Sequence, residues 1–166
     1  MLASFAARAG LFIEPSVGYT TGLLSQSGVP GISTQTFIFG GRVGYQFVDF
    51  KFGADYSMGL GSGKQMGDSA TYKPTDLGFF LGYELPLSLK AYGSVFLDSK
   101  AKIQPTENPS YFSGRSFRLG IGLTALPLCS IIFEGTYRIY SKYNGVGLTK
   151  SIKGTTWGGS LSFSLP

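Results

Sequence analysis

The stretch QTFIFGGRVGYQFVDFKFGADYSMGL, from residue 35 to residue 60, alternates apolar residues with small or charged ones. One side of the alternation consists of Phe37, Phe39, Val43, Tyr45, Phe47, Phe50, Phe52, Ala54, Tyr56, Met58 and Leu60. The other side holds mainly glycine and serine, with Arg42 and Asp55 among them. Alternation with a period of two is typical of β-strands whose two faces meet different surroundings. The stretch therefore predicts two strands joined at Val48-Asp49 in a β-hairpin.

The register of this hairpin follows from its two-residue turn. The aromatic pairs on the apolar face would be Phe47 with Phe50 and Tyr45 with Phe52. On the other face Arg42 would lie opposite Asp55, so both faces favour the same register. A three-residue turn at 86–88 would likewise set Glu84 opposite Lys90.

The same alternation occurs eight times along the chain, in segments of the length that a tilted strand needs to cross a bilayer. These segments are 9–21, 35–47, 50–60, 75–85, 88–98, 115–126, 130–141 and 155–165. Three connections are tight, whereas four are long and rich in turn residues: 22–34, 61–74, 99–114 and 141–154. This layout predicts one domain over 1–166, an all-β, eight-stranded antiparallel up-and-down transmembrane β-barrel. Its short turns and both termini would be periplasmic, and its four longer loops extracellular.

The composition supports a membrane barrel. Only 14% of the 166 residues are charged, against about 25% in a typical soluble domain. No apolar run approaches the roughly 18 residues of a membrane-spanning helix. Small polar-face residues suit the narrow interior of eight strands, so the large apolar residues should face lipid. The expected lipid-interface aromatics are Tyr19, Tyr45, Tyr56, Tyr83, Tyr137 and Trp157. A soluble lipocalin-like ligand-binding barrel, with the same strands turned inside out, is the alternative.

Charged residues on the polar face predict an ion-pair network inside the barrel. The expected lumen network comprises Glu14, Arg42, Lys51, Asp55, Glu84, Lys90, Arg118, Glu134 and Arg138, and the same face includes Asp76 and Asp98. Acids and bases are nearly balanced, as buried ions must be to offset desolvation. The network should close the lumen, although a small or gated pore for ions or solutes is an alternative. Removing Arg42 is expected to leave Asp55 buried and unpaired, at a cost of about 3–5 kcal/mol.

The four predicted loops are strongly basic. Their basic residues are Lys64, Lys73, Lys100, Lys102, Lys142, Lys150 and Lys153, against Asp68 and Glu107. The resulting +5 equals the net charge of the whole chain. Such loops would attract the phosphates of lipopolysaccharide or an acidic polymer on a host or partner cell, or would be an ordinary solvated surface. The loop aromatics Tyr72, Tyr111, Phe112 and Tyr143 are candidates for contact residues or for caps of the barrel mouth.

In its eight strands, its turns and its last strand, TTWGGSLSFSLP, the chain resembles the small outer-membrane barrels of the OmpX, Ail and OmpA transmembrane-domain type. The resemblance implies a non-enzymatic protein of envelope structure, surface interaction or adhesion. The chain has no histidine and one cysteine, which argues against the histidine-dependent enzymes of this fold class and against a metal site. We expect no cofactor, no metal and no nucleic acid, and a monomer in contact with outer-membrane lipid.

Overall fold

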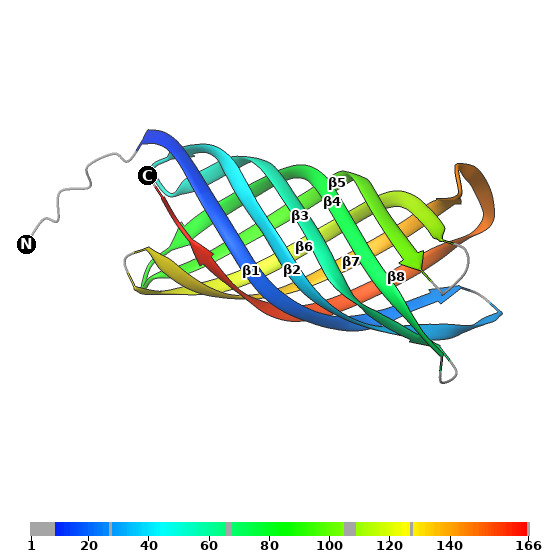
Figure 1. The fold of residues 1–166 in the computed structure, drawn as a ribbon. Coiled ribbons are helices and arrows are strands. Elements are labelled where there is room, and N and C mark those ends of the chain that lie inside the picture. The colour runs from blue at the N-terminus through cyan, green and yellow to red at the C-terminus, as the bar shows by residue number, and fades with distance from the viewer. Residues whose placement is uncertain (1–8, 27, 66–67, 105–108, 127, 166) are drawn as a thin grey trace, which may run out of the picture.

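The computed structural model describes residues 9–26, 28–65, 68–104, 109–126 and 128–165. Eight antiparallel strands form a closed barrel in which each strand pairs with its neighbours in the chain and β1 pairs with β8 (Figure 1). The strands are β1 (Ala9–Gln26), β2 (Val29–Phe47), β3 (Phe50–Gln65), β4 (Asp68–Leu85), β5 (Leu89–Gln104), β6 (Ser110–Leu126), β7 (Cys129–Tyr143) and β8 (Val146–Phe163). In the described part of the chain, no helix is long and apolar enough to cross a membrane. The predicted eight-stranded barrel is confirmed.

The registers predicted from the tight turns are also confirmed. Around Val48-Asp49, Phe47 pairs with Phe50, and Arg42 lies opposite Asp55. Around the turn at 86–88, Glu84 lies opposite Lys90. These turns lie at the end of the barrel where β1 starts and β8 finishes, which we call the turn end (Figure 1).

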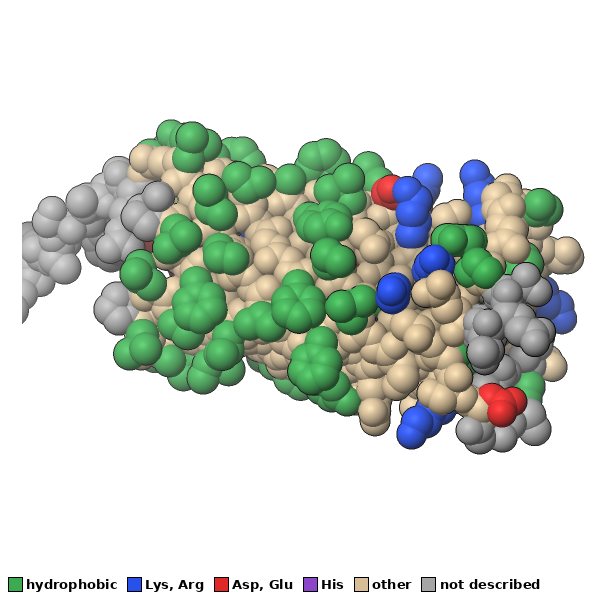
Figure 2. All heavy atoms as spheres, in the orientation of Figure 1, with side chains coloured by type: hydrophobic (Ala, Val, Ile, Leu, Met, Phe, Trp, Pro, Cys, Tyr) green, Lys and Arg blue, Asp and Glu red, His purple; other side chains and the backbone are tan. Residues whose placement is uncertain are grey.

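Most large apolar side chains of the predicted strands point outward, as the sequence predicts, whereas Phe12, Phe80 and Phe96 are buried inside. Leu119 and Phe79 are 72% and 63% exposed, whereas the inward Asp76 is fully buried. Green side chains cover the wall from the turn end to the middle of the barrel in Figure 2, and we call this region the apolar band. The six predicted interface aromatics, from Tyr19 to Trp157, all lie on the outer surface. This orientation is the reverse of the lipocalin-like alternative.

The strands are longer than predicted at the end opposite the turns. Most of the four segments expected to be loops (22–34, 61–74, 99–114 and 141–154) pair as strands, and we call these segments the extension. Inward and outward residues continue to alternate there, but apolar residues now point inward and charged ones outward. In β4, for example, Tyr72 is buried and Lys73 is exposed. Strands predicted from outward apolar residues therefore ended too early.

An irregularity in β5 changes the direction in which its residues point. The register with β6 shifts between Phe96 and Ser99, both of which are fully buried. Asp98 consequently lies on the outside, where its carboxylate accepts a 2.7 Å bond from Lys100. The prediction that Asp98 faces the lumen is wrong, because one extra residue in the strand exchanges its two faces.

Candidate functional site: a sealed lumen and a basic collar

The nine charged residues predicted to form the lumen network all point into the barrel, and Asp76 joins them. Eight of the nine are buried, and Glu84 at the turn end is half-buried. The inward set is five acids (Glu14, Asp55, Asp76, Glu84 and Glu134) and five bases (Arg42, Lys51, Lys90, Arg118 and Arg138). With Asp98 outside, the lumen charges balance, which is the condition for burying ions at acceptable cost.

Glu14 is the centre of the ion pairs nearest the turn end. Its carboxylate lies 2.7 Å from the Lys90 ammonium, 3.4 Å from the Arg42 guanidinium and 4.0 Å from the Lys51 ammonium. Lys51 also pairs with Glu84 at 2.6 Å. The expectation that Arg42 pairs with Asp55 is wrong, although their register is right. Arg42 has a carboxylate directly opposite it on each neighbouring strand, Glu14 on β1 and Asp55 on β3, and it pairs with Glu14.

Asp76 is the centre of a second group of ion pairs, farther from the turn end. Its oxygens lie 2.7 Å from the Arg138 guanidinium and 3.7 Å from that of Arg118. Ser99 and Ser116 also donate to it, at 2.6 and 3.0 Å. Arg118 lies 3.8 Å from Asp55 as well, so this one cation connects two carboxylates.

Tyr92 connects Arg42 of the first group to Glu134. Its hydroxyl donates to Glu134, and its ring lies 3.9 Å from the Arg42 guanidinium carbon. The ring lies against Gly120, where a side chain would collide with it. Glycine on this face therefore makes room for a bulky residue that fills the lumen.

An apolar cluster closes the lumen within the extension. Its buried members are Leu24, Tyr72, Ala101 and Tyr140, and Ile32, Ile103, Phe112 and Ile152 pack against them. The hydroxyls of Tyr72 and Tyr140 lie 3.2 Å apart, and burial raises the pKa of Tyr72. Tyr72 therefore stays protonated and can share a hydrogen bond with Tyr140. Of the predicted loop aromatics, Tyr72 and Phe112 fill the barrel, whereas Tyr111 is half-exposed.

A cavity of about 700 Å³ occupies the turn end of the lumen. Phe12, Lys51, Lys90 and Ser164 are among its lining residues. Beyond this cavity, in the part of the chain that the structure describes, the two groups of ion pairs and then the apolar cluster fill the interior. As far as the described residues show, the interior is therefore open at the turn end and filled by side chains within the extension.

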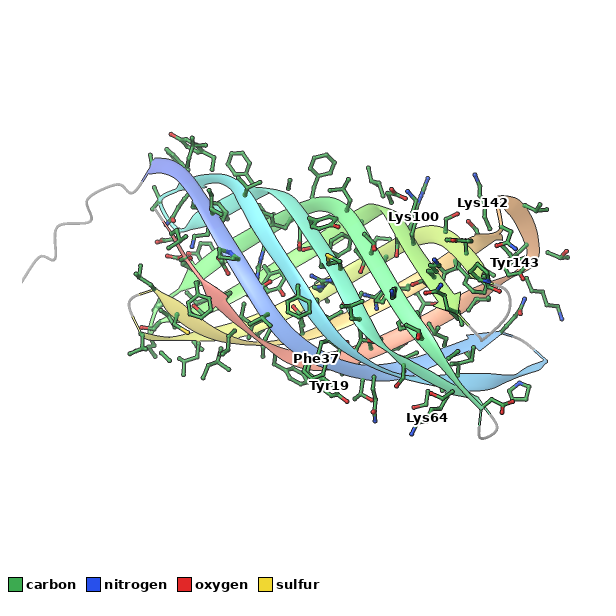
Figure 3. The ribbon with its side chains drawn as sticks, viewed as in Figure 1. Tyr19, Phe37, Lys64, Lys100, Lys142 and Tyr143 are labelled. Carbon is green, nitrogen blue, oxygen red and sulfur yellow. The ribbon has the colours of Figure 1, made fainter. Side chains whose placement is uncertain are left out.

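The seven basic residues expected on loops all lie on strands. Lys64 is on β3, Lys73 on β4, Lys100 and Lys102 on β5, Lys142 on β7, and Lys150 and Lys153 on β8. All are exposed except Lys102, which is half-buried. Arg115 of β6 is exposed beside them, and sequence reasoning missed it because its segment was predicted to be a membrane strand. We call these eight residues the basic collar; Lys64, Lys100 and Lys142 are labelled in Figure 3.

The collar is densest on β4–β7. Lys73 lies directly opposite Lys102 in the sheet, and Ser113 of β6 lies opposite both Lys100 and Lys142. Like charges that face each other across strands destabilise a sheet. The Lys100–Asp98 pair is the one ion pair of the collar among the described residues. This wall therefore has positive charge that the described part of the protein does not neutralise.

The collar begins where the apolar band ends. Going away from the turn end, the outward residues of β6 change from the apolar Phe117 to the cation Arg115. Those of β5 change from the apolar Leu97 to the cation Lys100. Figure 2 shows blue side chains next to the green band. The cations therefore lie on the side wall of the barrel, on strands β3 to β8, and not only at its tip.

Searches with protein-family models and among curated proteins gave no match for this chain. Among solved structures, the chain is similar to Ail of Yersinia pestis in complex with the heparin analogue sucrose octasulfate, with a TM-score of 0.65 and 13% identity over 93% of this chain and 99% of Ail. It is similar to Neisserial surface protein A, with a TM-score of 0.60 and 16% identity over 94% and 98% of the two chains. The N-terminal β-barrel domain of Pseudomonas aeruginosa OprF matches with a TM-score of 0.52 and 12% identity, over 94% of this chain and all of that chain. The chain thus has the fold of small eight-stranded outer-membrane barrels.

Proposed function

We propose that this chain is a non-enzymatic integral protein of the bacterial outer membrane whose basic collar binds phosphate groups of lipopolysaccharide. The turn end and both termini would lie in the periplasm and the extension outside the cell. The observation that carries the proposal is the position of the collar, on the side wall directly beyond the apolar band. With the band in the acyl chains, the collar cations nearest to it, such as Arg115 and Lys100, lie at the depth of the lipid phosphates.

Charge distribution supports this function. The described lumen residues are neutral in sum, so the eight collar cations dominate the field of the outer half. A soluble partner would be met mainly by the tip of the extension, whereas Arg115 and Lys100 face sideways next to Phe117 and Leu97. Ail, which has the same fold, forms a complex with a sulfated sugar, so a barrel of this kind can bind polyanions.

The sealed interior argues against the alternative of a small or gated pore. An ion crossing the barrel would have to separate the pairs around Asp76 and then pass the apolar cluster of Leu24, Tyr72 and Tyr140. Breaking a buried ion pair costs several kcal/mol. The interior is better explained as a filled core that supports the outer wall.

The experiment inserts the purified, refolded protein into neutral phosphatidylcholine vesicles and measures its binding of lipopolysaccharide mixed into the same bilayer, with vesicles that lack lipopolysaccharide as the blank. The test variant replaces Lys73, Lys100, Lys102 and Arg115 by glutamine. Each cation near an anionic surface contributes about 1 kcal/mol, so the affinity for lipopolysaccharide should fall by roughly 100-fold or more. The interaction of the unchanged protein should also weaken as salt is added.

The control variant places glutamine at Thr75 and Ser113, neutral positions on the same wall. It should bind as the unchanged protein does. Both variants should resist SDS until heated, which reports a folded barrel. Equal binding by the four-glutamine variant and the unchanged protein would reject the proposed function.

A further inference from the structure

One row of the collar contains an aromatic ring beside two cations. Lys73 of β4 lies opposite Lys102 of β5, and Lys102 lies opposite Tyr111 of β6. The Lys102 ammonium is 5.3 Å from the centre of the Tyr111 ring, and the tyrosine is 50% exposed. We infer that these three side chains form a subsite for a sugar ring of the lipopolysaccharide core that bears a phosphate or carboxylate group. The inference rests on the proposed function and names the part of lipopolysaccharide that this row binds.

Tyr111 is held in place by the hairpin between β7 and β8. Its N–H donates to the Asn144 side-chain oxygen at 2.9 Å, and the Asn144 N–H donates to the Tyr111 carbonyl at 2.8 Å. Asn144 and Gly145 both have positive φ angles, 46° and 83°, as tight hairpin turns require. The backbone that bears the ring is thus fixed before any ligand arrives, which lowers the entropic cost of binding.

The chemistry of the row matches an anionic sugar. A tyrosine offers a large, rigid contact surface at low entropic cost, and the apolar face of a sugar ring can pack on it. Side chains directly opposite on neighbouring strands start about 4.5–5.5 Å apart, so the ammonium groups of Lys73 and Lys102 can reach one anionic group together. An anion between them would also relieve their mutual repulsion.

The height of the row distinguishes it from the rest of the collar. Tyr111 lies four residues beyond Arg115 on the same strand, about 13 Å along it at about 3.3 Å per residue. With a strand tilt of about 40°, this is roughly 10 Å farther from the bilayer centre. Arg115 therefore lies at the level of the lipid A phosphates, whereas Tyr111 lies at the level of the core sugars attached to lipid A.

The test compares two ligands embedded in phosphatidylcholine vesicles: lipid A alone and lipopolysaccharide that includes the core sugars. Tyr111→Ala should lower the affinity for the core-bearing lipid about tenfold and leave the affinity for lipid A unchanged. Tyr111→Phe, which keeps the ring, should behave as the unchanged protein. The backbone bonds to Asn144 do not involve the Tyr111 side chain, so all three proteins should show the same heat-induced mobility shift in SDS.

The outcomes separate this inference from the proposed function. Equal affinity of Tyr111→Ala and the unchanged protein for the core-bearing lipid would overturn the subsite and leave the collar proposal standing. An equal loss for lipid A and for core-bearing lipid would also overturn it, because the ring would then act at the level of the anchor. Tyr111-dependent binding of soluble heparin but not of the core sugars would show that the row serves a glycan outside the membrane instead. Failure of the unchanged protein to bind either lipid would reject the collar function itself.

Discussion

The apolar band and the extension are built from the same eight strands, yet their polarity is opposite. In the band, most leucine and phenylalanine residues face outward and ions are buried, with Leu119 outside and Asp76 inside as examples. In the extension the buried residues include Leu24 and Tyr72, and the cations are outside. The band therefore has the polarity of a membrane barrel, and the extension has the polarity of a water-soluble barrel. The sheet continues from one to the other without a break. What changes between them is the solvent that each wall meets.

The largest effect should come from an ion in the core of the band. Asp76→Ala would leave Arg138 and Arg118 without their shared carboxylate, and removing one partner of a buried ion pair costs about 3–5 kcal/mol. Asp98→Ala is the matched control, because Asp98 pairs with Lys100 on the exposed wall, and such pairs contribute at most about 1 kcal/mol. Urea unfolding of both variants in phospholipid vesicles measures the difference. Similar unfolding midpoints for the two variants would contradict the conclusion that the band buries its ions inside the barrel.

The extension should depend on its apolar interior. Leu24→Ala opens a cavity in the cluster with Tyr72 and Tyr140, and burying such a leucine contributes about 2–5 kcal/mol. Its neighbour Leu23 points outward and is 52% exposed, so Leu23→Ala should change stability by only about 0.5 kcal/mol. Hydrogen exchange should accelerate in the extension of Leu24→Ala while amides of the band keep their protection. Uniform acceleration over the whole barrel would show that the two regions do not differ in this way.

The band was predictable from the sequence, and the extension was not. Outward apolar residues such as Phe37 and Leu119 mark membrane strands, and the turns at Val48-Asp49 and 86–88 determine the registers. The extension keeps the period of two, but the residue types on the two faces are exchanged. In the band the apolar Leu77 is outside and the charged Asp76 inside, whereas in the extension the charged Lys73 is outside and the aromatic Tyr72 inside. A search for outward apolar residues reads that exchange as the end of the strand. Following the period alone, without assuming which face is apolar, would have found these strands.

The membership of the lumen network was predictable, whereas its pairing was not. Alternation shows which residues point inward, and all nine charged residues of the predicted network point inward in the structure, where Glu134 accepts a hydrogen bond from Tyr92. It gives a register only where a tight turn is recognised. No tight turn was predicted between β1 and β2, so the position of Glu14 opposite Arg42, and hence the partner of Arg42, could not be predicted. Alternation also does not show bulges, and the one in β5 moved Asp98 to the outer wall. Arg115 was missed for a related reason, since nothing in its strand marks the level at which the band ends.

The smallest of these effects concerns Arg42, and it shows what distributed pairing does for the band. The register alone predicts that loss of Arg42 leaves Asp55 buried without a partner. In the structure, however, Asp55 keeps a 2.6 Å hydrogen bond from Ser94 and lies 3.8 Å from Arg118. Glu14, the actual partner, keeps Lys90 at 2.7 Å.

Arg42→Ala should therefore cost only the weaker ion pair and the packing on the Tyr92 ring, about 1–3 kcal/mol. The same urea titration measures it, with Arg115→Ala, an exposed arginine, as the control that should change little. A cost as large as that of Asp76→Ala would mean that Arg42 is indispensable to its cluster. An intermediate value would instead indicate that the core of the band shares each charge among several partners, so that its stability depends on Asp76 more than on any one cation.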